Sequence, residues 1–357
     1  MSRAARVEDA VAPSLADFTV ACICPLGVEC AAVEGMLDEI YDLLPTARVQ
    51  NAYTFGRLGK HYVVVAVMPQ MGSNAAATTA TQVLNDFPSL RFGLLVGIGG
   101  GVPGESHPEV YEETHRNNDI RLGDIVVSEA TDVFGGVVQY DLGKRLADGS
   151  FQRTGQLNKP PAVLSGNVKR LESQHRRVGS QIEAYLKAML KRYPTMRRKY
   201  QHPGIEEDRL FRADYIHSSG ATCKDCDDER TVRRKARSDT DPRIHYGTIG
   251  SANVVVKNAK TRDALREDMG ILCVEMEAAG LMDTFPCLVI RGICDYADSH
   301  KNKSWQPYAA ATAAAYMKEL LMIIPPQQVK KAIKAQEIMQ ADNSSHICSP
   351  TVSTVST

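Results

Sequence analysis

A continuous apolar run, Cys287 to Ile290, most constrains what this chain can fold into. Its length and composition are typical of a strand buried on both faces of a parallel sheet. Open α/β sheets bind their ligands at the carboxyl ends of such strands, and this run leads through Arg291 to Asp295. Upstream, Glu277 is expected to open a short helix. The sequence therefore predicts that two carboxylates, distant in the chain, meet at the mouth of one crevice.

Other segments extend this pattern into an α/β fold. Further buried strands are predicted at Phe18–Cys24, Phe92–Val96 and Ile244–Gly250, and a hairpin at Tyr53–Met68. Helices are expected from Val28, from Ala75 with Ser73 or Asn74 as the N-cap, and over Gln306–Ile324. A chain of 357 residues has enough length for one large α/β domain or two smaller ones.

Charge and cysteine usage restrict the environment and the partners. Lys and Arg together number 42, as do Asp and Glu, so the net charge is zero and a general nucleic-acid binder is not expected. No apolar run reaches membrane-spanning length, and the N-terminus leads into no signal-type apolar core. Nine cysteines without framework spacing fit a reducing compartment. We expect a cytoplasmic protein without a membrane partner.

Two short motifs suggest cofactors but lack the context that would confirm them. The glycine run Gly97–Gly101 follows a predicted strand, yet a loop rather than a helix follows it, so a dinucleotide fingerprint is not supported. Cys223 and Cys226 form a C-x-x-C motif with His202 and His217 nearby in sequence. A zinc site needs two more well-spaced ligands, so an unliganded loop is the favoured interpretation and no metal is predicted.

The stretches Val274–Gly280 and Arg291–Asp295 resemble the signature of the nucleoside phosphorylase/nucleosidase superfamily, which is Glu-Met-Glu-Ala-Ala followed by an apolar strand ending in Arg-Gly-Ile-Cys-Asp. Leu122–Val127 is similar to a further strand entry of that family. The resemblance covers roughly residues 18–140 and 244–324. It implies a single α/β domain with a central mixed β-sheet flanked by helices, a three-layer α/β/α fold.

The resemblance implies a role for each of three carboxylates. Glu277 would hold the ribose hydroxyls, Asp295 would donate a proton or hydrogen bond to purine N7, and Glu29 would position the attacking water. The implied substrate-binding residues are Gly97, Ile98, Gly99, Gly100, Asn253, Val254, Val255, Glu275 and Met276. No metal or organic cofactor is required. We expect Asp295 to be protonated in aliphatic surroundings, and Arg291 to pair with Glu275 or another carboxylate.

This sequence departs from the family pattern at two places. Relatives often stack an aromatic residue on the base where Val254 and Val255 stand here, so Tyr140 or Tyr296 is expected to stack instead. Phosphorylases of the family hold phosphate with arginines and a serine, but Leu95 and Ile98 occupy two of the aligned positions. Aliphatic side chains supply none of the donors that a desolvated phosphate needs. Hydrolysis is therefore predicted.

The leading prediction is a purine nucleoside N-ribohydrolase that releases free base and ribose. Three alternatives stay open: a nucleotide N-glycosidase acting on ATP or a similar substrate, a phosphate-dependent purine nucleoside phosphorylase that uses Arg57 or Arg153, and a catalytically silent nucleotide-sensing module. Relatives in the family are commonly oligomers, so the resemblance also implies a homo-oligomer.

The chain is predicted to have three parts: a flexible leader at 1–16, the domain at 17–325 and a flexible tail at 326–357. Within the domain, residues 142–243 have no clear counterpart in the minimal nucleosidase core and are expected to form a basic helical insertion, with two amphipathic helices between Val163 and Leu190. The insertion's charges are expected to form a solvated face or, alternatively, to receive the phosphates of a nucleotide.

Overall fold

The centre of the computed structural model, which describes residues 13–42, 51–104, 119–218 and 220–340, is a sheet of eleven strands. Its main path runs β10 (Ile244–Gly247), β6 (Ile125–Ser128), β13 (Cys287–Asp295), β5 (Phe92–Gly101), β1 (Val20–Cys24), β4 (His61–Val67), β3 (Ala52–Leu58) and β2 (Glu39–Tyr41). β7 (Val137–Gln139), β11 (Ile249–Ser251) and β12 (Cys273–Glu275) extend it from the far end of β5. β13 pairs parallel with β5 and antiparallel with β6, so the predicted mixed sheet is confirmed.

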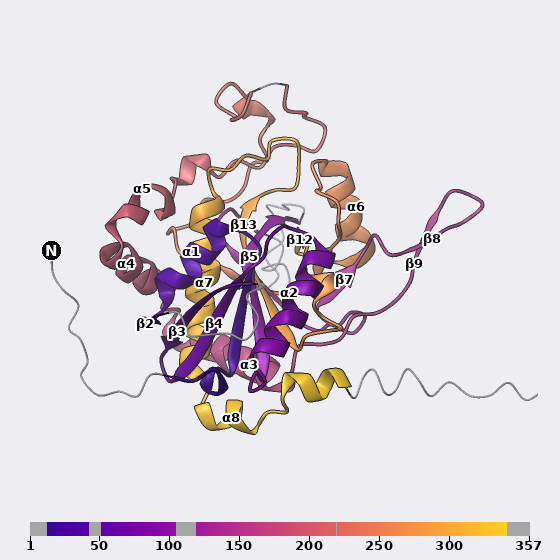
Figure 1. Cartoon of the computed structure of the whole chain (residues 1–357). Helices are drawn as coiled ribbons and strands as arrows, with labels where there is room; N and C mark the ends of the chain where they lie inside the picture. The colour runs from indigo at the N-terminus through magenta and orange to yellow at the C-terminus, as the bar shows by residue number, and fades with distance from the viewer. Residues whose placement is uncertain (1–12, 43–50, 105–118, 219, 341–357) are drawn as a thin grey trace, which may run out of the picture.

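Successive residues of the central strands bury against opposite helical layers. Val20, Cys22 and Cys24 of β1 face the core that contains α1 (Gly27–Met36) and α7 (Gln306–Ile323). Ala21 and Ile23 face the core that contains α2 (Ser73–Asp86). Figure 1 shows α1 and α7 on one side of the sheet and α2 on the other. Because both faces are apolar and covered, the fold has the three α/β/α layers that were predicted.

Small residues bring α7 close to the strand that carries the candidate site. A side chain on Gly292 of β13 would place its Cβ 1.8 Å from the carbonyl oxygen of Ala309 in α7. Only glycine leaves room for this contact. The close packing of α7 holds the carboxyl end of β13, and therefore Asp295, at a fixed position.

The expected insertion contributes to this core. Its two amphipathic helices are α3 (Ala162–Val178) and α4 (Ile182–Arg192), and their apolar faces join the α7 core. They are followed by α5 (Arg197–Tyr200) and by 3-10 turns at Pro194–Met196, Ile205–Glu207 and Asp228–Arg230. A hairpin of β8 (Gly143–Arg145) and β9 (Phe151–Arg153) projects from the body (Figure 1). The helical part of this segment is thus packed against the domain.

The flexible tail was predicted to begin at residue 326, which is too early in the chain. Residues 326–340 contain α8 (Pro326–Lys331) and pack on the domain, because Val329 and Ala335 are buried and Ala335 N–H donates to the Leu90 carbonyl at 2.9 Å. Residues 341–357 lie outside the described residues, as does most of the expected leader; Leu15–Asp17 form a 3-10 turn. Within the described ranges, no helix is long and apolar enough to cross a membrane.

Two local predictions, the helix at Glu277 and the N-cap of α2, differ from the structure. Glu277 precedes a 3-10 turn, Ala278–Gly280, rather than a helix, because the turn ends where Gly280 packs on the backbone of Ser73. Gly72, with φ 108°, is the N-cap of α2 in place of Ser73 or Asn74. The first N–H groups at this end donate to side chains from distant segments, Gly72 to Glu277 and Ser73 to Asn253. These bonds tie α2 to the candidate site.

Candidate functional site

The first carboxylate of the site, Glu29, lies in the first turn of α1 and is almost completely buried. The N–H of Leu26 donates to its Oε2 at 2.6 Å, and the N–H of Ile98 donates to its Oε1 at 2.7 Å. Burial raises the pKa of Glu29 to about 8, although the nearby Arg291 and the two N–H donors act in the opposite direction. Glu29 is therefore a fixed carboxyl group able to exchange a proton near neutral pH.

Arg291, on β13, joins the carboxylates to one another. Its side chain is fully buried, and its Nη2 contacts the carboxylates of both Glu275 and Glu277, the latter at 3.1 Å. Its Nη1 lies 4.0 Å from Glu29 Oε1. The expected pairing of Arg291 with Glu275 is therefore present, together with two further carboxylates that the sequence analysis had not connected to it.

Glu275 and Glu277 have different surroundings although both contact Arg291. The Glu275 carboxylate accepts the N–H groups of Glu277 and Ala278, so it holds the turn that follows β12. Glu277 Oε1 accepts only a longer bond, 3.3 Å, from the Gly72 N–H. Burial raises the pKa of Glu277, and the neighbouring Glu275 adds to this effect against the opposing charge of Arg291. Glu277 is thus the better placed of the two to bind hydroxyl groups.

Asp295 ends β13 in surroundings that are more polar than expected. Its Oδ1 accepts the N–H of Ala297 at 2.9 Å, and its Oδ2 lies 3.1 Å from the Lys301 ammonium. The charge of Asp295 raises the pKa of Lys301 although burial acts against it. The expectation of purely aliphatic neighbours was wrong, because the loop after β13 turns back and brings Lys301 to the carboxylate. The sequence showed only a polar loop here.

These groups line one hollow of about 750 Å³. Of the predicted residues it is lined by Glu29, Ile98, Gly99, Gly100, Val254, Val255, Glu275, Met276, Glu277 and Asp295. Leu26, Met71, Lys301 and Gln306, which the sequence analysis did not identify, line it as well. The fold therefore brings the three predicted catalytic carboxylates together around one space.

Two predicted substrate-binding residues do not line this hollow. Gly97 lies behind it, where an added Cβ would come within 2.2 Å of Arg291 Nη1 and 2.5 Å of Glu29 Oε1. Asn253 bonds instead to the N-terminus of α2, because its Oδ1 accepts the Ser73 N–H at 2.9 Å. Gly97 thus makes room for the charged cluster, and Asn253 fixes the wall of the hollow.

The apolar wall consists of aliphatic and thioether side chains. Neither tyrosine proposed for base stacking lines the hollow. The Tyr296 hydroxyl is bonded to Asp208 and to Arg234, and the Tyr140 ring packs against Gly250. The expectation that Tyr140 or Tyr296 stacks on the base is therefore not supported. Met71, Val254, Val255 and Met276 supply the apolar surface instead.

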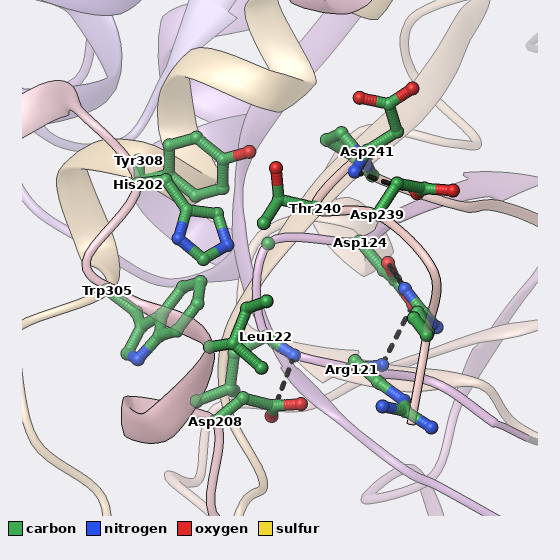
Figure 2. Close-up of a pocket in the computed structure, with 14 residues that line it drawn as sticks. Arg121, Leu122, Asp124, His202, Asp208, Asp239, Thr240, Asp241, Trp305 and Tyr308 are labelled. Atoms are coloured by element: carbon green, nitrogen blue, oxygen red, sulfur yellow. Dashed lines mark hydrogen bonds and ion pairs between the residues drawn. The ribbon is translucent and has the colours of Figure 1, made fainter. Parts of the chain in front are cut away.

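Figure 2 shows a second hollow, of about 400 Å³, whose lining includes His202, Trp305, Tyr308 and Asp239–Asp241. None of the three predicted catalytic carboxylates lines it. Burial alone would raise the pKa of its Asp124, but hydrogen bonds from Arg237 and His245 outweigh this and lower the pKa to about 2. Because its buried carboxylate is already neutralised by these partners, we assign this hollow a structural role.

Comparisons with known proteins agree with this architecture. A model of the phosphorylase superfamily matches residues 195–322. A nucleotide-binding leucine-rich repeat (NLR)-like protein from Hyaloscypha variabilis is 44% identical over 323 residues, which cover 89% of this chain but only 31% of that protein. A 5′-methylthioadenosine/S-adenosylhomocysteine nucleosidase from Mycobacterium bovis is 24% identical over 86% of this chain and 97% of its own length.

Solved structures share the fold at lower identity. Futalosine hydrolase of Helicobacter pylori has a TM-score of 0.53 at 15% identity and covers 86% of this chain and 99% of its own. The 5′-methylthioadenosine/S-adenosylhomocysteine nucleosidase of the same species has a TM-score of 0.52 at 15% identity and covers 85% of this chain and 98% of its own. At these identities the likeness concerns the fold.

Proposed function

Because this chain belongs to the nucleoside phosphorylase/nucleosidase superfamily, we propose that it hydrolyses the N-glycosidic bond of a purine nucleoside and releases free base and ribose. The observation that carries this proposal is the convergence of Glu29, Glu277 and Asp295 on one hollow. Cleavage of this bond generates positive charge on the ribose and negative charge on the leaving base. The three carboxyl groups and Arg291 match these needs.

In the proposed reaction, water attacks ribose C1′ while the bond from C1′ to the purine nitrogen breaks. Glu29 accepts the proton of the water, and Glu277 binds the ribose hydroxyls. The ion pair of Asp295 and Lys301, whose atoms lie 3.1 Å apart, passes the ammonium proton through Asp295 to purine N7, so the bonding electrons leave with a neutral base. Lys301 is then neutral until it takes up a proton from solvent.

Hydrolysis is favoured over phosphorolysis by the charge around the hollow. Among the described residues that line it, Lys301 is the only cation, and it is paired with Asp295. Arg291 behind it is paired with Glu275 and Glu277. Leu95, at an aligned phosphate position, lies in the apolar core, and Ile98 presents an aliphatic side chain. A phosphate dianion would find carboxylates and no unpaired cation there.

The decisive experiment is chromatography of purine nucleosides incubated with the purified protein, with and without inorganic phosphate. We expect free base and ribose at equal rates in both conditions, and a large loss of rate in Asp295→Asn. Release that requires phosphate and yields ribose 1-phosphate would replace hydrolase by phosphorylase. A folded protein that releases no base from any purine nucleoside or nucleotide would leave the silent, nucleotide-sensing alternative.

A nucleotide substrate is a second candidate, favoured by the position of α5. The Tyr200 hydroxyl donates to the Val28 carbonyl at 3.0 Å, so α5 is anchored to the start of α1, close to Glu29. The preceding Arg197, Arg198 and Lys199 are exposed. A basic run here suits the phosphates of ATP. Replacing all three by alanine should slow adenine release from ATP and spare release from adenosine, whereas Lys191→Ala on α4 should change neither.

We also propose a homo-oligomer, because apolar side chains at the hollow are exposed. Met71 is 50% exposed, Val254 60% and Val255 43%. A second copy of the chain that covers them would remove apolar surface from water and close the site. Light scattering coupled to size-exclusion chromatography should show a defined oligomer that Val254→Asp weakens. A monomer at all concentrations would contradict this proposal.

A further inference from the structure

The loop between α5 and β10 contains a cysteine and histidine cluster that the proposed reaction does not use. Cys223 and Cys226 were expected to be unliganded because the sequence offered no well-placed partners. The structure brings His217 to them: the ligand atoms of His217, Cys223 and Cys226 all lie within 4.8 Å of one another. His202, the other candidate, packs against Trp305 and Tyr308. The cluster is therefore formed by folding as well as by the C-x-x-C spacing.

The geometry of the three residues suits a tetrahedral ion. Zn²⁺ bound at about 2.3 Å by sulfur and about 2.1 Å by nitrogen holds its ligand atoms roughly 3.5–3.8 Å apart, so a small contraction of this cluster completes the arrangement. The His217 Nε2 lies 3.2 Å from the Thr222 carbonyl. Donation to that carbonyl leaves Nδ1 with its lone pair, and a metal-bound histidine commonly makes such a bond from its other nitrogen.

His300 is an independent sign that a ligand is missing. It is 6% exposed, and neither ring nitrogen has a hydrogen-bond partner within the described part of the chain. The nearest carboxylate oxygen, on Asp298, is 3.8 Å from Nδ1, which is too long for a hydrogen bond. The ring lies edge-on to His217 with centroids 5.4 Å apart, and the His300 carbonyl accepts the Cys223 thiol at 3.5 Å. Buried imidazole nitrogens without partners are costly.

We propose that Cys223, Cys226 and His217 bind one Zn²⁺, with His300 rotating in as the fourth ligand. Two thiolates and two imidazoles form a closed donor set typical of structural zinc, with no open position for water. None of the four ligands is one of the carboxylates assigned to the proposed reaction. It gives His300 the partner it lacks and turns the C-x-x-C loop into a fixed part of the domain.

The position of the cluster indicates what the ion does. The backbone N–H of His217 donates to Ser299 Oγ at 3.0 Å, so the cysteine loop lies against the loop that follows Asp295. That second loop carries both His300 and Lys301, whose ammonium contacts Asp295. Cys223 and Asp295 also line one common hollow. Zinc would therefore connect the two loops and hold Lys301 at the catalytic carboxylate without contacting substrate.

The test is metal analysis of the full chain purified without chelator. We expect about one Zn²⁺ per chain in the parent protein and in Asp225→Asn, which alters an exposed side chain inside the same motif. Cys226→Ser and His217→Ala should lose most of the metal and melt at a lower temperature. Zinc retained by both ligand variants, or a parent protein free of zinc with Cys223 and Cys226 joined in a disulfide, would overturn the proposal.

Co²⁺ substitution keeps the proposal testable if a variant fails to fold. Parent protein stripped by a chelator and titrated with Co²⁺ should develop the absorption of thiolate-bound tetrahedral cobalt, and added Zn²⁺ should abolish it. The reactivity of Cys223 and Cys226 toward a thiol reagent should fall when Zn²⁺ is restored. Absence of cobalt–thiolate absorption would refute the site. Full zinc retention in His300→Gln would refute the assignment of the fourth ligand.

Discussion

Glu29 allows the sharpest test of the proposed site because its burial makes a quantitative claim. Its pKa rises from an ordinary value of 4.5 to about 8, and burial is the main cause. At about 1.4 kcal/mol per pH unit, ionisation of this group costs the folded state roughly 5 kcal/mol. Because the folded-state pKa is raised, the stabilising effect of the bound proton is fully present below pH 4.5 and is lost as the pH rises through about 8.

Catalysis should show the opposite pH dependence. The proposed reaction makes Glu29 the base that accepts a proton from water, so Glu29 must be ionised in the free enzyme. We expect kcat/KM for a purine nucleoside to rise about tenfold per pH unit until the pH approaches the pKa of Glu29, about 8, and then to level off. Glu29→Gln should lower kcat/KM by about 10²–10⁴ and lose this ascending limb.

Denaturant unfolding supplies the second measurement. The free energy of unfolding of the parent protein should fall relative to Glu29→Gln as the pH rises from 5 to 9, by roughly 4 kcal/mol. Glu34→Gln, on the same helix but bonded to Thr54 outside the hollow, is the matched control and should keep the parent's profile. A parent rate profile that is flat between pH 6 and 9, or an ascending limb that persists in Glu29→Gln, would refute the reasoning.

Three further predictions concern the remaining parts of the site. Arg291→Met leaves buried carboxylates without a counter-charge and should destabilise the fold by about 3–5 kcal/mol, measured as a lower urea midpoint at pH 8. Asp295→Asn should lower kcat by about 10²–10⁴ with little change in KM, measured by initial rates, while circular dichroism stays unchanged. Gly97→Ala should lower stability and activity, because its Cβ would meet Arg291 and Glu29. Gly166→Ala in α3 is the control: its Cβ meets nothing within 4 Å, so this variant should be more stable than the parent by about 0.5–1 kcal/mol in the same unfolding assay.

Local patterns in the sequence were sufficient to predict the central strands, whereas the three layers were implied by the family resemblance. The continuous apolar runs of β1 and β13 each indicate a strand buried on both faces, and both strands were predicted. The hairpin of β3 and β4 was also predicted from the Gly59–Lys60 turn, where Gly59 has φ 58°. These features depend on neighbours in the chain, which a single sequence displays directly.

Features that depend on contacts between distant segments could not be predicted in the same way. Lys301 reaches Asp295 because the intervening loop reverses, and Ala297 adopts a positive φ of 51° within it. His217 reaches Cys223 through a loop with no regular pattern. In both cases the residue types were visible in the sequence, but nothing in their spacing indicated the reversal. The chemistry of a loop is therefore the part of a site that sequence patterns leave undetermined.

The carboxylates around Arg291 carry an electrostatic cost when they are all ionised, and this cost bears on the proposed function. Three buried carboxylates, Glu29, Glu275 and Glu277, surround the single guanidinium of Arg291, so full ionisation leaves an excess of negative charge. Burial is the main cause that raises the pKa values of Glu29 and Glu277 in the empty site, and repulsion from the neighbouring carboxylates adds to it, so both groups favour proton uptake. A ribose ring that becomes cationic in the transition state supplies the missing positive charge. The electrostatic cost carried by the empty site is thus relieved when the glycosidic bond breaks, which favours the transition state over the bound nucleoside.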